Sequence, residues 1–303
     1  MTGPVAVVDC GTNTTRVLIT DGVDLEIREQ RITGLGRGLG AGGALQPDSI
    51  ARTVTALEEF GAMLIEHGVQ SVRAVATSAA RDASNRSEFF EPAAAALGVG
   101  LELLSGEDEG RYGFAGATSD LEGDDYVLMV DIGGGSTEFA LGRPGRVPEV
   151  SHSVQMGSVR FTEKFFEHDP PWASELSTAI SVAKLHLDDV VLAHPSVALA
   201  PRMVAVAGTA TTIAAVELGM VDYDRNVIDA FTLTRAEAED VFRTLATESL
   251  ADRVYNPGLQ PERADVIVGG CCILVAIMRH FEFDEVRIRD HDLLDGIAAE
   301  LLK

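Results

Sequence analysis

A chain of 303 residues with 46% apolar and 23% charged side chains has the length for two domains and the composition of a globular protein. Its net charge of −23 argues against nonspecific binding to nucleic acid, and no apolar run reaches the roughly 18 residues of a membrane span. Three cysteines without the spacing of a disulfide framework or a zinc site, and a start without a signal peptide, lead us to expect a cytoplasmic protein.

The first predicted strand, 5–8, is a short apolar run that ends in a polar turn. The turn spans Asp9 to Arg16 and leads into a second apolar run at 17–19, so we expect a buried strand–turn–strand unit. Glycine lets backbone N–H groups converge on an anion, and hydroxyl side chains add donors. The residues that we expect to bind phosphate here are Gly11, Thr12, Asn13, Thr14 and Arg16.

A glycine-rich segment follows at 34–43, and its glycines at 38, 40 and 43 match the spacing of a dinucleotide-binding fingerprint. We reject that interpretation because residues 28–31 are polar where a buried strand would be required. We expect a flexible loop instead, from which Arg37 could reach into a ligand cleft. A helix that begins at Pro47 and is closed by Gly68 comes next.

Arg81 lies just past another predicted strand, 72–76. In that position it could bind a phosphate, but a surface ion pair with the neighbouring Asp82 explains the spacing equally well. A helix over 89–97 and a strand over 99–104 follow in the sequence.

Three consecutive acidic residues, Glu107, Asp108 and Glu109, stand at the start of the next predicted helix. Ser105 and Asp108 resemble a capping box, and acidic residues in a first helical turn interact favourably with the helix dipole. Capping accounts for one or two acids more easily than for three. Small and acidic residues at 116–125 mark the predicted domain boundary.

The segment 127–141 repeats the first unit in a richer form, with three successive glycines between two apolar runs. Asp131 and Glu138 flank the turn, and although carboxylates repel phosphate, they can hold a hard cation that bridges to one. The pattern predicts a metal–phosphate site; the alternative is a tight hairpin that uses glycine only for its geometry. The expected phosphate donors are Gly133, Gly134, Gly135 and Ser136.

The two turns align without gaps, because Asp131 lies 122 positions after Asp9 and Gly133 lies 122 positions after Gly11. Two such units about one domain length apart predict two similar halves that face each other across a cleft. We therefore predict an α/β fold of two ribonuclease H-like domains, the class that includes actin, sugar kinases and acetate kinase. The predicted domains are 1–122 and 123–291, with a last helix, 292–303, packing back on the first domain.

The remaining predicted elements contain one more candidate site. A strand at 204–206 runs into Gly208 and Thr209, which we place at a helix N-terminus suited to a phosphate or nucleoside, although helix capping is an equal alternative. The other elements are a helix around Phe161, a long helix after Trp172, helices over 234–249 and 264–281, and a strand at 286–288.

Five motifs, taken in order, resemble those of the exopolyphosphatase and guanosine pentaphosphate phosphohydrolase (Ppx/GppA) family, in a short two-domain form. The resemblance covers nearly the whole chain. Gly34, Arg37, Asp108 and Gly110 depart from the family pattern. The motifs are Asp9–Arg16, Ala76–Arg86, Ser105–Glu109, Asp131–Glu138, and Pro257–Leu259 together with Arg263–Asp265.

The resemblance implies hydrolysis of the terminal phosphoanhydride bond of inorganic polyphosphate, with release of orthophosphate. Glu109 falls on the family's catalytic glutamate, which orients and deprotonates the attacking water. Arg16 and Arg81 would bind neighbouring phosphates. The implied cofactor is Mg²⁺ or Mn²⁺, held by Asp9, Asp131 and Glu138.

Other functions fit the same motifs. Guanosine pentaphosphate (pppGpp) also presents a terminal phosphoanhydride bond, and no residue in the sequence reports a guanine pocket. A noncatalytic sensor of alarmones or polyphosphate, and a sugar or acetate kinase, are the alternatives outside the phosphatases. The expected partner is a small phosphate compound rather than nucleic acid or a membrane, with a homodimer as a possible assembly.

Overall fold

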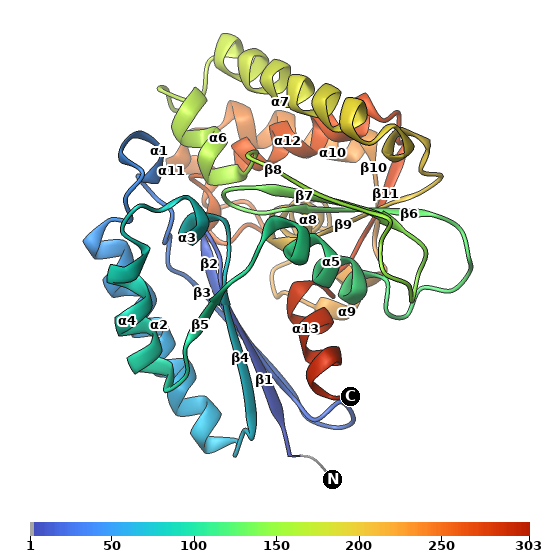
Figure 1. Cartoon of the computed structure of the whole chain (residues 1–303). Helices are drawn as coiled ribbons and strands as arrows, with labels where there is room; N and C mark the ends of the chain where they lie inside the picture. Colours follow the sequence, from blue (N-terminus) through green and yellow to red (C-terminus); the bar gives the residue numbers. More distant parts are fainter. Residues whose placement is uncertain (1–2) are drawn as a thin grey trace.

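Two β-sheets, one from each half of the chain, organise the computed structural model, which describes residues 3–303 (Figure 1). The first sheet contains β1 (Val5–Cys10), β2 (Thr14–Thr20), β3 (Glu26–Ile32), β4 (Ser71–Ala76) and β5 (Leu101–Leu103). Its order is β3-β2-β1-β4-β5, in which β1 pairs antiparallel with β2 and parallel with β4. The polar segment before the glycine-rich loop is thus the edge strand β3, where one side of the strand faces solvent.

The second sheet repeats this arrangement and extends it by one strand. Its order is β10-β11-β9-β6-β7-β8, in which β6 pairs antiparallel with β7 and parallel with β9, as β1 does with β2 and β4. Both predicted strand–turn–strand units are therefore central hairpins of their sheets. The strands are β6 (Val127–Ile132), β7 (Thr137–Gly142), β8 (Val150–Val154), β9 (Met203–Val206), β10 (Thr232–Thr234) and β11 (Glu285–Ile288).

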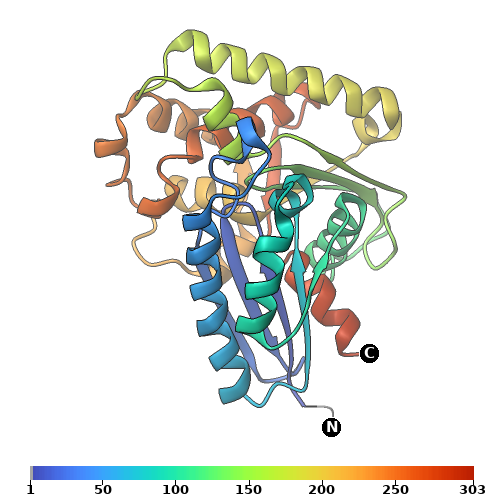
Figure 2. The ribbon, with the colours of Figure 1, turned by 60° about the vertical axis from the view of Figure 1, so that its left-hand side comes forward.

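Helices α2 (Pro47–Glu66) and α4 (Arg86–Leu97) cover one face of the first sheet side by side (Figure 2). Pro47 suits the first position of α2, since its missing N–H has no partner there in any helix. Leu57 and Phe60 of α2 are fully buried in the core of this half. Two short helices, α1 (Leu39–Gly42) and α3 (Ser78–Asp82), follow β3 and β4.

The largest apolar core lies under the second sheet and is centred on α12 (Ile267–His280). Every residue of α12 from Ile267 to Met278 is buried, and the long helix α7 (Ala173–Ala193) packs along it at the outer edge of the molecule (Figure 1). The other helices of this half are α6 (Ser158–Phe165), α8 (Ala207–Glu217), α9 (Arg225–Ala230), α10 (Arg235–Thr247) and α11 (Leu250–Arg253), with 3₁₀ turns at Pro195–Leu199 and Pro261–Arg263.

Helices α5 (Gly106–Ala117) and α13 (Leu293–Leu301) lie against each other between the two sheets (Figure 1). Glycine allows their close crossing, because a Cβ on Gly116 would come within 1.9 Å of the Asp292 carbonyl oxygen and one on Gly296 within 2.0 Å of the Tyr112 carbonyl oxygen. Helix α5 packs on β6, β7 and β8, whereas α13 packs on β1 and β2. The pair therefore links the two sheets below the central hairpins.

Across residues 3–303, no helix is both long enough and apolar enough to cross a lipid bilayer.

Candidate active site

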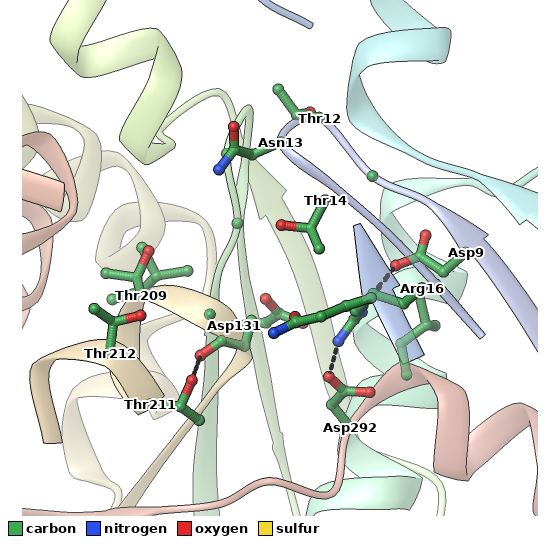
Figure 3. Close-up of a pocket in the computed structure, with 18 of the residues that line it drawn as sticks. Asp9, Thr12, Asn13, Thr14, Arg16, Asp131, Thr209, Thr211, Thr212 and Asp292 are labelled. Carbon is green, nitrogen blue, oxygen red and sulfur yellow. Dashed lines mark hydrogen bonds and ion pairs between the residues drawn. The ribbon is translucent and has the colours of Figure 1, made fainter. Parts of the chain in front are cut away.

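A cleft of about 350 Å³ lies where the turns of the two central hairpins meet (Figure 3). Fourteen of the sixteen predicted site residues line it; Arg81 and Glu138, both in the described part of the chain, lie outside its lining. Residues of the cleft that sequence reasoning did not single out as site residues include Ser78, Tyr223, Arg225, Arg263, Asp290 and Asp292. The predicted residues that line it are Asp9, Gly11, Thr12, Asn13, Thr14, Arg16, Glu109, Asp131, Gly133, Gly134, Gly135, Ser136, Gly208 and Thr209.

In the first hairpin, Asp9 stands opposite Arg16 in the ladder and accepts a hydrogen bond of 2.8 Å from its Nη2. Asp292, at the start of α13, pairs with Nη1 of the same arginine (Figure 3). Burial raises the pKa of Asp9, and the Arg16 charge offsets part of that rise. Burial also pushes up the pKa of Asp292, but Arg16, the backbone N–H of Leu294 and Arg28 together lower that pKa below its usual value. Arg16 is thus oriented by two carboxylates.

In the second hairpin, the first turn of α6 holds the carbonyl groups of all three glycines. The backbone N–H of Ser158 donates to Gly133 at 2.9 Å, that of Val159 donates to Gly134 at 2.9 Å, and Nε of Arg160 donates to Gly135 at 2.7 Å. Because C=O and the following N–H point in opposite directions in a trans peptide, the N–H groups of residues 134–136 face away from α6. They are placed to bind an anion in the cleft, which these residues line.

The two turns touch each other, and only glycine fits at the contact. A Cβ on Gly134 would come within 3.0 Å of the Thr12 side chain, and one on Gly135 within 2.6 Å of Ser78 Oγ. The buried Thr12 and Ser78 hydroxyls and the buried Asn13 side-chain oxygen have no hydrogen-bond partner among the described residues. These polar atoms lack partners where the cleft opens, which a bound polar ligand would correct.

Glu109 is buried on the inner side of α5, although its two acidic neighbours are not. Ser105 caps the helix by accepting a 3.0 Å bond from the Asp108 N–H, and the side chain of Asp108 pairs outward with Arg111. Glu109 instead accepts a 2.6 Å hydrogen bond from Arg81. Burial raises the pKa of Glu109 to about 7, even though Arg81 lowers it. The capping explanation therefore accounts for Asp108 but not for the buried side chain of Glu109.

Arg81 lies between two of the predicted functional carboxylates. Besides Glu109 it bonds the Leu104 carbonyl oxygen at 3.0 Å, and its Nη2 lies 3.9 Å from Glu138. The alternative ion pair between Arg81 and Asp82 is absent among the described residues; Asp82 pairs with Arg160 instead. Phosphate binding by Arg81 stays a prediction, since its guanidinium holds Glu109 in this structure.

Asp131 and Glu138 stand opposite each other in the second hairpin, a like-charged pair that is almost fully buried. Burial, followed by the nearby Glu109 charge, raises the pKa values of both well above the usual range. Ser153 donates to one oxygen of Glu138 at 2.7 Å, while the other oxygen, like Oδ1 of Asp9, is buried without a described partner. Such orphaned carboxylate oxygens fit a divalent cation.

No three carboxylate, imidazole or thiol side chains within residues 3–303 converge closely enough to enclose a metal ion by themselves. This agrees with the habits of Mg²⁺, which protein sites usually hold through one or two carboxylates while water and substrate phosphate supply the other ligands. The predicted donors Asp9, Asp131 and Glu138 therefore fit a cation that is bound together with a phosphate.

Gly208 and Thr209 lie in the first turn of α8, on the wall of the cleft that faces the first hairpin (Figure 3). The guanidinium of Arg263 covers this turn so closely that a Cβ on Gly208 would come within 2.1 Å of its Nη1. Burial, followed by the Arg16 charge, lowers the pKa of Arg263 to about 10, and no described acidic residue pairs with it. A half-buried cation beside a helix N-terminus favours an anionic ligand.

The structure is an α/β fold of two similar halves, in which the turns of the two central hairpins meet at one cleft. A family model described as the Ppx/GppA phosphatase family matches residues 19–303, so the chain belongs to that family. Membership confirms the predicted family, the predicted fold class and the predicted class of enzyme, a hydrolase of phosphoanhydride bonds.

Individual relatives agree with this assignment. Exopolyphosphatase 2 of Mycobacterium tuberculosis is 39% identical over 98% of both chains. The guanosine-5'-triphosphate,3'-diphosphate pyrophosphatase of Vibrio atlanticus is 28% identical over 98% of this chain and 59% of its own length. Among solved structures, that of an exopolyphosphatase-like protein has a TM-score of 0.94 at 31% identity, covering 98% of each chain.

Proposed function

We propose that the protein is an exopolyphosphatase that hydrolyses the terminal phosphoanhydride bond of short inorganic polyphosphate and releases orthophosphate. The observation that carries this proposal is the meeting of the two hairpin turns beside the buried carboxylate of Glu109. The name of the Mycobacterium tuberculosis relative supports it. The direct test is release of orthophosphate from polyphosphate of defined length by the purified protein.

Substrate binding rests on the two turns. The N–H groups of residues 134–136 and the hydroxyls of Thr12 and Ser78 would bind the terminal phosphate by hydrogen bonds. Arg16 and Arg263 would bind the next phosphates, since both guanidinium groups line the cleft. Such local donors are necessary because a protein of net charge −23 repels a polyanion at long range.

Glu109 would position and deprotonate the attacking water. Its pKa of about 7 suits a general base at neutral pH, since a base is most effective when its pKa is near the working pH. Arg81 would hold the carboxylate in one orientation through the 2.6 Å hydrogen bond. Precise placement of the water contributes at least as much as basicity in phosphoryl transfer.

Asp131, Glu138 and the free oxygen of Asp9 would hold Mg²⁺ or Mn²⁺. When bound, the cation neutralises charge on the transferring phosphoryl group and lowers the repulsion between phosphate and the acidic hairpin.

We propose short chains as substrates because the cleft holds about 350 Å³ and the net charge of −23 disfavours extended polyanions. Turnover per chain end should therefore be better on short polyphosphates than on chains of hundreds of phosphates. The measurement is kcat/KM per terminal phosphate for a series of purified lengths. A steep rise of this value with length would contradict the proposal.

A second candidate is hydrolysis of pppGpp, and two other residues of the cleft favour it. The lining includes Tyr223, whose hydroxyl donates to the Asp290 carboxylate at 2.9 Å. An aromatic face and a carboxylate can stack on a purine and accept hydrogen bonds from its edge. Parallel assays on tripolyphosphate and pppGpp decide between the two, and Tyr223→Ala should lower kcat/KM only for the nucleotide. Binding of either compound without phosphate release would support the noncatalytic sensor instead.

The two sheets also support the predicted division into domains 1–122 and 123–291, with 292–303 assigned to the first because α13 packs on β1 and β2. Helix α5, which carries Glu109, contacts both halves, because it packs on α13 as well as on β6, β7 and β8 of the second sheet.

A further inference from the structure

Arg160 bridges the two halves of the molecule with one guanidinium group. It lies in the first turn of α6, in the second half, and its Nε donates to the carbonyl oxygen of Gly135 at 2.7 Å. Its Nη2 forms an ion pair of 2.5 Å with Asp82, the last residue of α3 in the first half. Both side chains are only 27% exposed, so solvent screens the pair less than a surface ion pair.

Helix α3 is the point where these contacts converge. Within its five residues, Ser78 lies against Gly135, Arg81 holds Glu109, and Asp82 holds Arg160. The glycine turn and the inward-facing carboxylate are therefore both fixed against one short rigid segment. Gln155 adds a second donor from the other half to Asp82, at 3.3 Å.

We propose that Arg160 is a positioning residue for phosphate hydrolysis. By bonding Gly135 and Asp82 together, it sets the distance between the phosphate held by the glycine turn and the water held by Glu109. This inference rests on the proposed function, because it assumes that Glu109 and the turn act on one substrate. Neither Arg160 nor Asp82 lines the cleft in the described chain, so their effect would pass through the groups that they hold.

The chemistry of arginine suits this role. A planar guanidinium fork can donate to a carbonyl and a carboxylate at the same time in a fixed geometry, whereas the lysine ammonium is a single flexible point charge. Arg160→Lys would therefore keep the charge but lose the simultaneous contact with Gly135 and Asp82. Asp82→Asn, of nearly the same shape, would remove the charge from the other end of the bridge.

The test combines kinetics of these two variants and their double mutant with a matched control. The control is Arg143→Gln, which removes a guanidinium that pairs with Asp124 at 3.0 Å and lies outside the cleft lining of the described chain. We expect Arg160→Lys to lower kcat by about 10²-fold with little change in KM, since small misplacements of reacting groups carry costs of that order. The double mutant should lose no more activity than the worse single variant, because both changes break one bridge.

Two outcomes would overturn the proposal: a kcat within about threefold of wild type in Arg160→Lys, or losses in the two single variants that multiply in the double mutant. A purely structural role would lower the Tm while leaving kcat of the folded protein unchanged. Amide hydrogen exchange of residues 133–137 is a readout independent of activity, and it should speed up in both bridge variants but not in Arg143→Gln. If wild type releases no phosphate, the proposed function fails, while unchanged exchange in Arg160→Lys means that the bridge itself fails.

Discussion

The turns of the two central hairpins share a strand–turn–strand design and differ in charge at one position of the ladder. Asp9 of the first hairpin stands opposite Arg16, whereas Asp131 of the second stands opposite Glu138. The first pair forms a salt bridge of 2.8 Å. Within residues 3–303, Asp131 has no ion-pair partner, and the cation nearest to Glu138 is Arg81 at 3.9 Å.

Because the first hairpin has arginine where the second has glutamate, the two hairpins have different roles. In the first hairpin, Arg16 offsets part of the charge of Asp9 and also lines the cleft. The second hairpin buries two like charges, whose pKa values burial and neighbouring charge raise, and such a pair is stable when a cation or a proton reduces its charge. The comparison teaches that the need for metal arises mainly in the second half.

Removal of divalent metal should have the largest effect on phosphate release. It is also the most direct test of the difference in charge between the two hairpins. We expect phosphate release to fall to background after exhaustive chelation, because Asp131 and Glu138 would then repel the substrate. Addition of Mg²⁺ alone should raise the Tm of wild type, as expected for a ligand of the native state, and raise it far less in Asp131→Asn. Undiminished phosphate release in chelator would rule out the metal requirement.

The next largest effect should come from Glu109→Gln. This change keeps shape and hydrogen bonding but removes the base, so kcat should fall by about 10²–10⁴-fold. Substrate binding should survive, or tighten slightly, since a negative charge near the phosphates is lost. Glu107→Gln and Asp108→Asn are matched controls in the same helical turn and should lose far less activity. If the kcat of Glu109→Gln is within about threefold of wild type, Glu109 serves the start of the helix rather than catalysis.

The paired hairpins could be predicted from sequence because all their determinants are local. Glycines, carboxylates and hydroxyls at fixed spacing specify each turn, and the repeated spacing places both turns at one cleft. Asp292 and Arg160 could not be found in this way, since tertiary packing brings them to the turns from distant segments. Ser78 and Arg263 were visible as parts of motifs, but only the fold shows that Ser78 lies against Gly135 and that the Arg263 guanidinium covers the start of α8.

The ion-pair partners of the predicted arginines could not be predicted from the sequence either. The family resemblance assigned Arg16 and Arg81 to the phosphates next to the terminal one. It could not show that Arg16 is shared by Asp9 and Asp292, or that Arg81 holds Glu109, since these partners depend on distances across the fold. Arg16 lines the cleft and Arg81 lies outside its lining, and the sequence did not show the ion pairs of either residue.

Arg16→Gln tests whether Arg16 offsets the carboxylate charges of Asp9 and Asp292. The variant leaves Asp9 and Asp292 as buried carboxylates without their shared cation, which should lower the free energy of unfolding by about 3 kcal/mol. Chemical denaturation in the presence of chelator measures the change. Arg31→Gln, on the neighbouring edge strand with exposed ion pairs, is the matched control and should cost less than about 1 kcal/mol. Equal losses in the two variants would show that Arg16 does not neutralise the turn.

Glu138→Gln is the corresponding substitution in the second hairpin. We expect it to change the free energy of unfolding in the opposite direction from Arg16→Gln. In the metal-free protein the change removes one of two buried like charges, while the amide oxygen can still accept the hydrogen bond from Ser153. The free energy of unfolding should therefore rise, by about 1 kcal/mol, even as activity is lost. With saturating Mg²⁺ the order should reverse, because wild type gains stability from the ion and the variant loses a ligand. Glu285 is exposed on β11 of the same sheet, and Glu285→Gln should not change the free energy of unfolding either in chelator or with saturating Mg²⁺. Destabilisation by Glu138→Gln in chelator would mean that Arg81, 3.9 Å away, already neutralises this hairpin as Arg16 does the first.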